Sequence, residues 1–290
     1  MRPSNLKTKI FLDSGDPSET REALALLGFL DGQTTNPSLI AKNPEAQERL
    51  ARGEKFTSVE VNEFYKKVAI EISGLLPEGS VSLEVYADAQ TTAQDALAQG
   101  KEMFSWIPNA HIKYPITPSC LEATEQSVAA GLRVNLTLCF SESQAAAVYA
   151  ATKAAAHMPK GSVFVSPFVG RLDDIGQNGM DLIKNCYTLY QEGDGHVEIL
   201  SASIRSMEHF LASIAYGADI ITAPLKILKA WAEAGMPVPE PGYIYPHGNL
   251  TAIPKESINL QKDWREYNLR HDLTDKGLVK FATDWKALFI

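Results

Sequence analysis

Residues 110–140 read AHIKYPITPSCLEATEQSVAAGLRVNLTLCF and contain two apolar runs separated by one helical pattern. The runs AHIKYPI and VNLTLCF have the length of buried strands. Between them, SCLEATEQSVAAG closes on a glycine, as helix ends prefer. A strand, a helix and a second strand in this order form the repeating unit of a parallel sheet. This stretch predicts an α/β fold.

The same alternation continues in both directions along the chain. Eight short apolar runs are each followed by a plausible helix, and several of these helices begin near Ser, Thr or Asp, which are favourable cap residues. The expected strands are KIFLD at 9–13, FLDGQTTNP at 29–37, VSLEVYA at 81–87, AHIKYPI at 110–116, VNLTLCF at 134–140, SVFVSPFVG at 162–170, VEILSASI at 197–204 and DIITAPL at 219–225.

Eight parallel strands with helices between them predict a (β/α)8 TIM barrel that occupies residues 1–290 as a single catalytic domain. An open doubly wound sheet is the alternative, but no GxGxxG or GxxxxGK[ST] sequence supports a nucleotide-binding version of it. Residues 236–262 are rich in Pro, Gly and Tyr and predict an irregular arm. Residues 275–289 have an amphipathic pattern and predict a C-terminal helix that packs on the barrel or on a neighbouring subunit.

Net charge and residue composition restrict the classes of ligand that this chain is expected to bind. A net charge of -8 argues against a nucleic-acid or membrane surface, so any anionic ligand must be held by a few local cations. The three cysteines show no metal-ligand or disulfide spacing, and no histidine lies in a ligand pattern with a carboxylate. We expect no metal and no cofactor. Without a signal-like or membrane-length apolar segment, we expect a cytoplasmic protein.

Lys113, in the middle of the apolar run HIKYPI, is the sharpest single feature. A lysine inside a strand loses the hydration of its ammonium, which favours the neutral amine that attacks a carbonyl carbon. Alone, such a lysine more often extends its amine to water at a strand end. Asp13 and Glu84, from two other expected strands, change that balance because they supply carboxylates for proton transfer near the same barrel end. His111 shares the strand face of Lys113, but a packed histidine is the safer interpretation.

The strings FLDSGD, TTNPSLI, SLEV, IKYPIT, NLTLCFS, SPFVGRLDD and SASIR follow one another in the order of the signature segments of transaldolases. The chain resembles that family over roughly residues 8–235. The resemblance implies a metal-free class I aldolase that carries a dihydroxyacetone unit from sedoheptulose 7-phosphate or fructose 6-phosphate to glyceraldehyde 3-phosphate or erythrose 4-phosphate, in the non-oxidative pentose phosphate pathway.

The same resemblance implies roles for individual residues. Lys113 would form the Schiff base, and Asp13 would exchange the proton of the C4 hydroxyl. Glu84 and Thr137 would position a water for proton transfer. The residues implied to hold the dihydroxyacetone unit are Thr34, Asn36, Asn135 and Ser166.

A phosphate group needs cationic donors, and the resemblance places Arg171 and Arg205 in that role, with Ser203 as a hydroxyl donor. Arg suits it because its planar guanidinium binds two phosphate oxygens at once. Both arginines follow consecutive expected strands, where phosphate sites of barrels often form.

Two rival functions remain open. A fructose 6-phosphate aldolase of the same superfamily would release free dihydroxyacetone, but such aldolases have Gln in place of Glu84 and Tyr in place of Phe168. A barrel that only binds sugar phosphates would have no need for an amine beside two carboxylates. For partners we expect small sugar phosphates and a homo-oligomer, with a dimer as the default. Tyr243, Tyr245 and His247 of the arm could cover the active site or contact another subunit, but solvent-exposed loop packing is the expected role.

Overall fold

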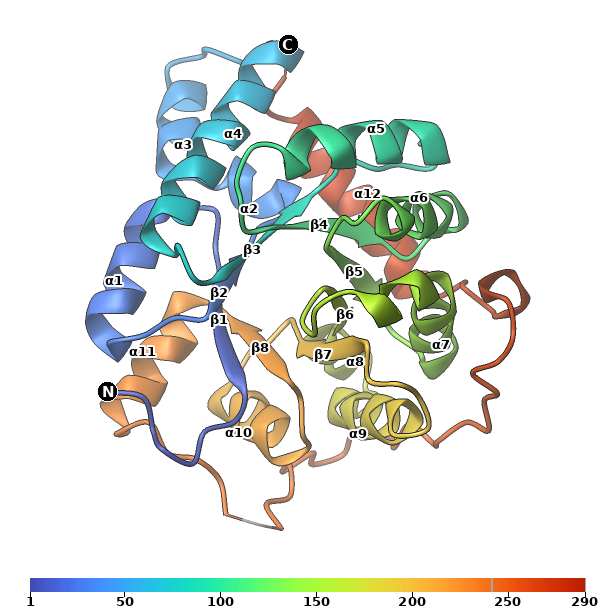
Figure 1. The fold of residues 1–290 in the computed structure, drawn as a ribbon. Coiled ribbons are helices and arrows are strands. Elements are labelled where there is room, and N and C mark those ends of the chain that lie inside the picture. Colours follow the sequence, from blue (N-terminus) through green and yellow to red (C-terminus); the bar gives the residue numbers. More distant parts are fainter. Residues whose placement is uncertain (241, 290) are drawn as a thin grey trace.

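A computed structural model describes residues 1–240 and 242–289, and its eight parallel strands close into a barrel in chain order, β1 to β8 (Figure 1). The predicted (β/α)8 barrel is therefore confirmed. The strands are β1 Lys9–Asp13, β2 Gly32–Thr34, β3 Ser80–Glu84, β4 Ala110–Pro115, β5 Val134–Cys139, β6 Val163–Pro167, β7 Val197–Ser201 and β8 Ile220–Ala223.

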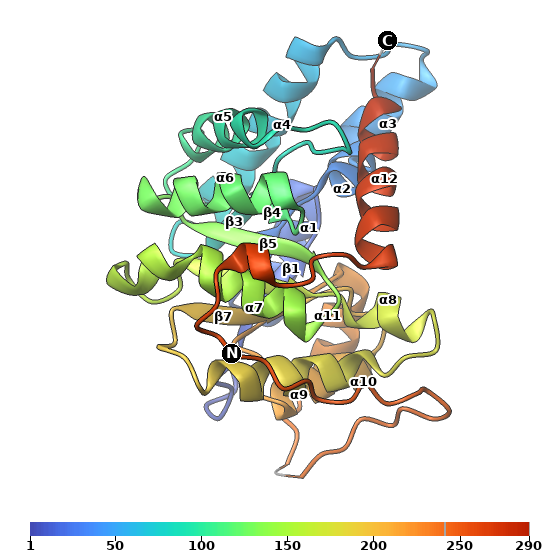
Figure 2. The ribbon, with the colours of Figure 1, turned by 90° about the vertical axis from the view of Figure 1, so that its right-hand side faces the viewer.

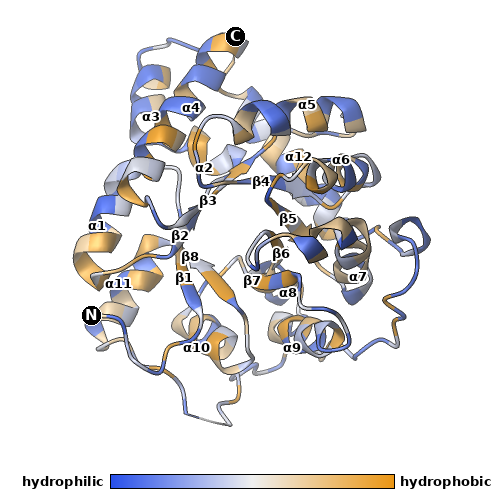
Figure 3. Ribbon diagram, viewed as in Figure 1, coloured by the Kyte–Doolittle hydropathy of each residue, from blue (hydrophilic) through white to orange (hydrophobic). Residues whose placement is uncertain are grey.

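Helices surround the barrel, and most of them carry both hydrophobic and hydrophilic residues, as expected of helices that bury one face (Figure 3). They are α1 Pro17–Leu27, α2 Pro37–Ala41, α3 Pro44–Ala51, α4 Ser58–Leu75, α5 Ala93–Phe104, α6 Pro118–Ala129, α7 Glu142–Ala151, α8 Val169–Asp173, α9 Gly179–Tyr190, α10 Met207–Ala215, α11 Leu225–Glu233 and α12 Asp272–Lys286. Short 3-10 turns occur at Lys153–His157 and Trp264–Glu266.

Every expected strand overlaps an observed one, and the bounds of all but the first differ by one to three residues at one end or at both. The run 29–37 forms only the three residues of β2, because the Asn36 side chain accepts a hydrogen bond from Leu39 N at 2.9 Å and so caps α2. The run 162–170 ends at Pro167, and α8 begins at Val169. Some polar residues that the pattern places at strand ends, such as Asn36, are therefore helix caps.

Strand β5 has an irregularity next to the centre of the barrel. Its register with β6 shifts between Leu136 and Cys139, and Leu138 adopts φ +60°, a left-handed conformation that is unfavourable for a branched side chain. Conformations of this kind cluster near functional sites when the surrounding structure holds them in place. The bulge directly follows Thr137.

The arm expected at 236–262 contains no regular helix or strand among its described residues, as the composition predicts. The expectation of exposed aromatic packing is wrong for Tyr245, which is buried. Its hydroxyl donates to Asp173 Oδ2 at 2.6 Å, and its ring stacks on His209 with centroids 5.2 Å apart. Residues far apart in sequence form this contact, so local composition could not indicate it.

The C-terminal helix expected at 275–289 is α12, which begins three residues earlier. It lies beside α2 at one end of the barrel (Figure 2). Two of its residues, Lys280 and Phe281, reach a cavity at the carboxyl ends of the strands. This helix therefore packs on the barrel of its own chain.

Candidate functional site

A cavity of 270 Å³ opens at the carboxyl ends of the strands, where barrel enzymes place their chemistry. Most of the predicted site residues line it: Asp13, Thr34, Asn36, Lys113, Ser166, Phe168, Arg171, Ser203 and Arg205. The other three, Glu84, Asn135 and Thr137, do not line the cavity and are buried in β3 and β5, the two strands that flank β4. Residues from seven expected strand segments thus gather in one region.

Lys113 and Glu84 form a buried ion pair at the centre of this region. Lys113 Nζ lies 2.8 Å from Glu84 Oε2, and both side chains are almost fully buried, with 4% and 2% of their areas exposed. The amine also donates to the Thr35 carbonyl at 3.2 Å. Burial raises the pKa of Glu84, while the charge of Lys113 acts to lower it. The lysine therefore has a carboxylate within proton-transfer distance.

Asp13 is held at the end of β1 by a short chain of hydroxyls. Thr34 Oγ1 donates to Asp13 Oδ1 at 2.7 Å and lies 2.6 Å from Thr222 Oγ1. Burial raises the pKa of Asp13, and the charge of Lys113 and the hydrogen bond from Thr34 oppose that rise. A carboxyl with a raised pKa exchanges protons more readily near neutrality than an ordinary aspartate does.

Three neutral side chains form a buried hydrogen-bonded row across β3, β5 and β6. Asn135 Nδ2 donates to Ser82 Oγ at 3.1 Å, and Ser166 Oγ donates to Asn135 Oδ1 at 2.6 Å. Because Lys113 and Asn135 are paired in register on neighbouring strands, this row lies directly beside the lysine. Ser82 was not among the predicted site residues, since a serine in a strand has no distinctive sequence signal.

Thr137 differs from these residues because its hydroxyl makes no hydrogen bond with any described residue, although it is buried. Buried polar atoms are rarely left unpaired, and an unmatched hydroxyl costs about 1–3 kcal/mol. Glu84, the other predicted partner of a water, lies on β3, two strands away. An unused hydroxyl of this kind is free to bind a ligand or a solvent molecule.

The two predicted phosphate arginines differ in their surroundings. Arg171 forms no ion pair or hydrogen bond within the described part of the chain, and its guanidinium carbon lies 5.1 Å from the centroid of the Phe168 ring. Burial and the nearby charge of Arg205 lower the pKa of Arg171. Arg205 is exposed and donates to Asp174 Oδ2 at 3.1 Å. Two neighbouring cations, one of them half-buried, favour an anion between them.

Close backbone packing sets the position of the phosphate residues. A Cβ atom at Gly170 would lie 2.2 Å from the Ser203 carbonyl oxygen, so only glycine allows α8 to approach the segment that follows β7. Ser203 itself adopts φ +61°. The lack of space for a Cβ atom at this position is the physical reason for the Gly before the arginine in SPFVGR.

Sequence reasoning missed several residues that line the cavity. Lys42 follows α2, and Lys280 and Phe281 belong to α12. Lysines on exposed helix surfaces have no pattern that separates them from solvent-facing charges, and α12 is distant in sequence from the strands it meets. Thr222, on β8, was also missed, although its place in DIITAPL gave a weak signal.

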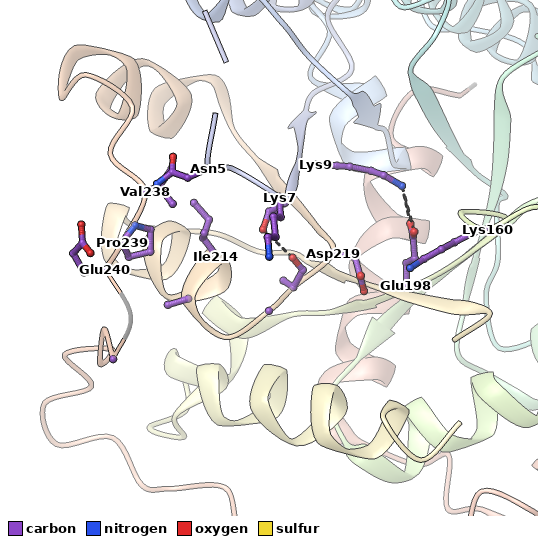
Figure 4. Close-up of a pocket in the computed structure, with 15 residues that line it drawn as sticks. Asn5, Lys7, Lys9, Lys160, Glu198, Ile214, Asp219, Val238, Pro239 and Glu240 are labelled. Atoms are coloured by element: carbon purple, nitrogen blue, oxygen red, sulfur yellow. Dashed lines mark hydrogen bonds and ion pairs between the residues drawn. The ribbon is translucent and has the colours of Figure 1, made fainter. Parts of the chain in front are cut away.

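A larger cavity, of 770 Å³, lies at the opposite end of the barrel and contains none of the predicted site residues (Figure 4). Lys9 Nζ donates there to Glu198 Oε2 at 3.0 Å. In the neighbouring part of the barrel His111 stacks on Phe164, and both of its ring nitrogens have hydrogen-bond partners, Ser80 and Gly161. The interpretation of His111 as a packed histidine agrees with this geometry.

Two classes of feature are not found among residues 1–240 and 242–289. No helix there is long and apolar enough to cross a membrane. No group of three or more His, Cys, Asp or Glu side chains there is arranged to hold a metal ion.

Comparisons with known proteins point to one family. The family model described as "Transaldolase/Fructose-6-phosphate aldolase" matches residues 10–290. A Dehalococcoides mccartyi protein is 32% identical over 280 residues, which cover 97% of this chain and 99% of the relative. A Paracoccus denitrificans protein is 35% identical over 277 residues, 96% of each chain. Both bear the name "Probable transaldolase". The chain therefore belongs to the transaldolase/fructose-6-phosphate aldolase family.

Proposed function

We propose that this protein is a transaldolase, which transfers a dihydroxyacetone unit from sedoheptulose 7-phosphate or fructose 6-phosphate to glyceraldehyde 3-phosphate or erythrose 4-phosphate. The observation that carries the proposal is the buried Lys113–Glu84 pair at 2.8 Å beside the carboxyl-end cavity. Residues 1–290 would act as one catalytic domain in the cytoplasm, in the non-oxidative pentose phosphate pathway, without metal or cofactor.

The first chemical step is imine formation at Lys113. The amine adds to the keto carbon of the donor sugar to give a carbinolamine, and loss of water then gives the protonated imine. Glu84 accepts and returns the protons that these steps move, because its carboxylate lies next to the amine. The unpaired Thr137 hydroxyl supports a role in holding the water that relays them.

The second step breaks the bond between C3 and C4. Asp13 takes the proton of the C4 hydroxyl, the aldehyde leaves, and the electron pair of the broken bond moves into the imine to form an enamine. The enamine then adds to the acceptor aldehyde, Asp13 returns the proton, and water hydrolyses the new imine to release the product ketose and the Lys113 amine. Thr34 keeps the Asp13 carboxyl oriented through its 2.7 Å hydrogen bond.

The remaining predicted residues bind the parts of the sugar that do not react. Asn36, Asn135 and Ser166 offer amide and hydroxyl groups to the dihydroxyacetone unit, and the buried Ser166–Asn135 bond keeps two of them fixed. Arg171, Ser203 and Arg205 hold the phosphate at the other end of the cavity. Binding at both ends places C4 near Asp13.

Two positions favour transfer over release of free dihydroxyacetone. Phe168 faces the cavity without a hydroxyl that could orient water toward the enamine, and Glu84 stands where the aldolases of this superfamily carry Gln. An enamine that is shielded from directed water survives until the acceptor arrives. A fructose 6-phosphate aldolase activity is the second candidate within the same family.

Mass spectrometry of the intact protein tests the proposal directly. After incubation with fructose 6-phosphate and sodium borohydride, the parent protein should gain the mass of a reduced ketose or dihydroxyacetone adduct, and Lys113→Ala should not. A product assay with erythrose 4-phosphate then separates transfer from release. Equal labelling of both proteins, or a folded parent that gains nothing with either donor sugar, would exclude the Lys113 mechanism.

A further inference from the structure

Helix α12 makes direct contact with Arg171, the arginine that is predicted to bind phosphate. The Phe281 ring lies 5.3 Å from the guanidinium carbon of Arg171, and the Phe168 ring lies 5.1 Å from it. Both distances are within the range of cation–π attraction. One ring comes from α12 and the other from the end of β6, so the guanidinium is held by two elements that are distant in sequence.

Helix α12 also approaches Arg171 closely at Gly277. A Cβ atom at Gly277 would lie 2.7 Å from Arg171 Nη1 and 2.6 Å from Leu138 Cδ2. Both of those atoms are the ends of flexible side chains, so an added methyl group would move them without blocking the helix. The glycine therefore gives the Arg171 guanidinium its present position.

Polar contacts fix α12 itself at both ends. Thr274 Oγ1 donates to the Leu138 carbonyl at 3.0 Å and accepts from Gln144 Nε2 at 2.8 Å. Near the other end, Ser38 of α2 donates to Asp284, which also accepts from Lys280 at 2.8 Å. These contacts tie the helix to the bulge of β5 at one end and to α2 at the other.

Aromatic rings hold the Arg171 guanidinium without using its N–H donors. Arg171 has no ion pair or hydrogen bond with any residue that the structure describes, whereas Arg205 has Asp174 as a partner. An arginine that is oriented by rings keeps its fork of donors available for an anion. This arrangement suits recognition of a phosphate better than a paired arginine would.

We propose that Phe281 and Gly277 of α12 are positioning residues that orient Arg171 for the substrate phosphate, so that the C-terminal helix sets the preference for phosphorylated sugars. This inference rests on the proposed function for the identity of the ligand. It assigns the two residues no contact with the reacting atoms. It predicts that changes in α12 weaken phosphate binding and leave the chemistry at Lys113 intact.

The test measures the dissociation constant of inorganic phosphate by isothermal titration calorimetry at low ionic strength. Phe281→Leu, which removes the ring face, should weaken phosphate binding about tenfold, and Gly277→Ala should weaken it in the same direction. Phe281→Tyr keeps the ring and should bind as the parent does. Val279→Ala, on the exposed side of the same helix, is the matched control. Thermal unfolding checks that each variant folds.

A second measurement separates positioning from general damage. The half-saturating concentration for the borohydride-trapped adduct should rise in Phe281→Leu with fructose 6-phosphate and stay constant with dihydroxyacetone, which has the carbonyl but no phosphate. An equal rise with both ligands, or unchanged phosphate affinity, would overturn the inference. A parent that binds phosphate but forms no adduct would refute the proposed function, and the calorimetric comparison would still decide the role of α12.

Discussion

Each end of the barrel holds a lysine–glutamate pair, and the two pairs have different surroundings. Lys113 and Glu84, at the carboxyl ends of the strands, are 2.8 Å apart with only 4% and 2% of their side chains exposed. Lys9 and Glu198, at the amino ends, are 3.0 Å apart, but 43% of the Lys9 side chain is exposed. The Lys9 amine reaches water, whereas the Lys113 amine reaches a cavity with other polar side chains.

The two ends of the barrel also differ in how completely their buried polar groups are hydrogen-bonded. At the amino end His111 has a partner for each ring nitrogen, so its polar atoms are satisfied within the protein. At the carboxyl end the Thr137 hydroxyl has no partner among the described residues, and Arg171 has no ion pair there. The polar groups that are satisfied within the protein therefore have a structural role at the amino end, whereas the unpaired groups at the carboxyl end are available to bind a ligand.

The largest expected effect on activity comes from replacing Lys113, with the same replacement at Lys9 for comparison. Lys113→Gln should reduce transfer of the dihydroxyacetone unit to background, because an amide cannot form an imine. Lys9→Gln, the matched control, should keep transfer near the parent rate, because it changes a pair at the opposite barrel end. The measurement is the rate of product formation from fructose 6-phosphate and erythrose 4-phosphate. Equal losses in the two variants would show that the comparison between the ends is wrong.

Asp13→Asn should produce the next largest effect. The amide keeps an oxygen for the Thr34 hydrogen bond but cannot take the C4 hydroxyl proton, so transfer should fall roughly 10²–10⁴-fold. Imine formation should continue, since Lys113 and Glu84 are unchanged. Steady-state transfer rates together with borohydride trapping check both parts. Loss of the trapped adduct in a folded variant would place Asp13 in the imine step.

His111 should make the amino end sensitive to acid. Burial lowers the pKa of His111 from its ordinary 6.5 to about 3, so the folded protein binds fewer protons than the unfolded chain between these values. Its contribution to stability is therefore present above pH 6.5 and is lost as the pH falls. At pH 5 the loss should be about 2 kcal/mol.

Urea unfolding at pH 7 and pH 5 measures this contribution. His111→Gln should show an acid-induced loss smaller by about that amount, whereas His157→Gln, at an exposed position, should behave as the parent does. An identical pH dependence in all three proteins would mean that the imidazole is protonated in the fold, in conflict with its stacked and doubly hydrogen-bonded geometry.

Phe168→Tyr should have the smallest effect on activity. It tests whether one side chain at the carboxyl-end cavity controls the balance between transfer and release. A new hydroxyl at the cavity could orient water toward the enamine, and one hydrogen bond of about 1 kcal/mol corresponds to a change of about fivefold. Release of free dihydroxyacetone should rise and transfer should fall. Quantifying both products from fructose 6-phosphate, with and without erythrose 4-phosphate, checks the ratio. No gain in released dihydroxyacetone would show that Phe168 does not shield the enamine.

The sequence alone determined the barrel and the set of candidate residues. Apolar runs that alternate with helical patterns are local signals, because strand burial and helix capping depend on neighbours in the chain. Polar residues inside those runs, such as Lys113 and Asn135, stood out for the same reason. Even the C-terminal helix was recognisable from its own amphipathic pattern, with a start only three residues from the observed one.

Only the tertiary structure decided which candidates meet. Strand parity gives His111 and Lys113 the same face, yet they lie at different depths of the barrel, one among packed rings and the other beside the cavity. The contacts of Phe281 and Gly277 with Arg171 join segments about a hundred residues apart. Such contacts depend on how whole elements pack in three dimensions, and no local pattern of residue types encodes that packing.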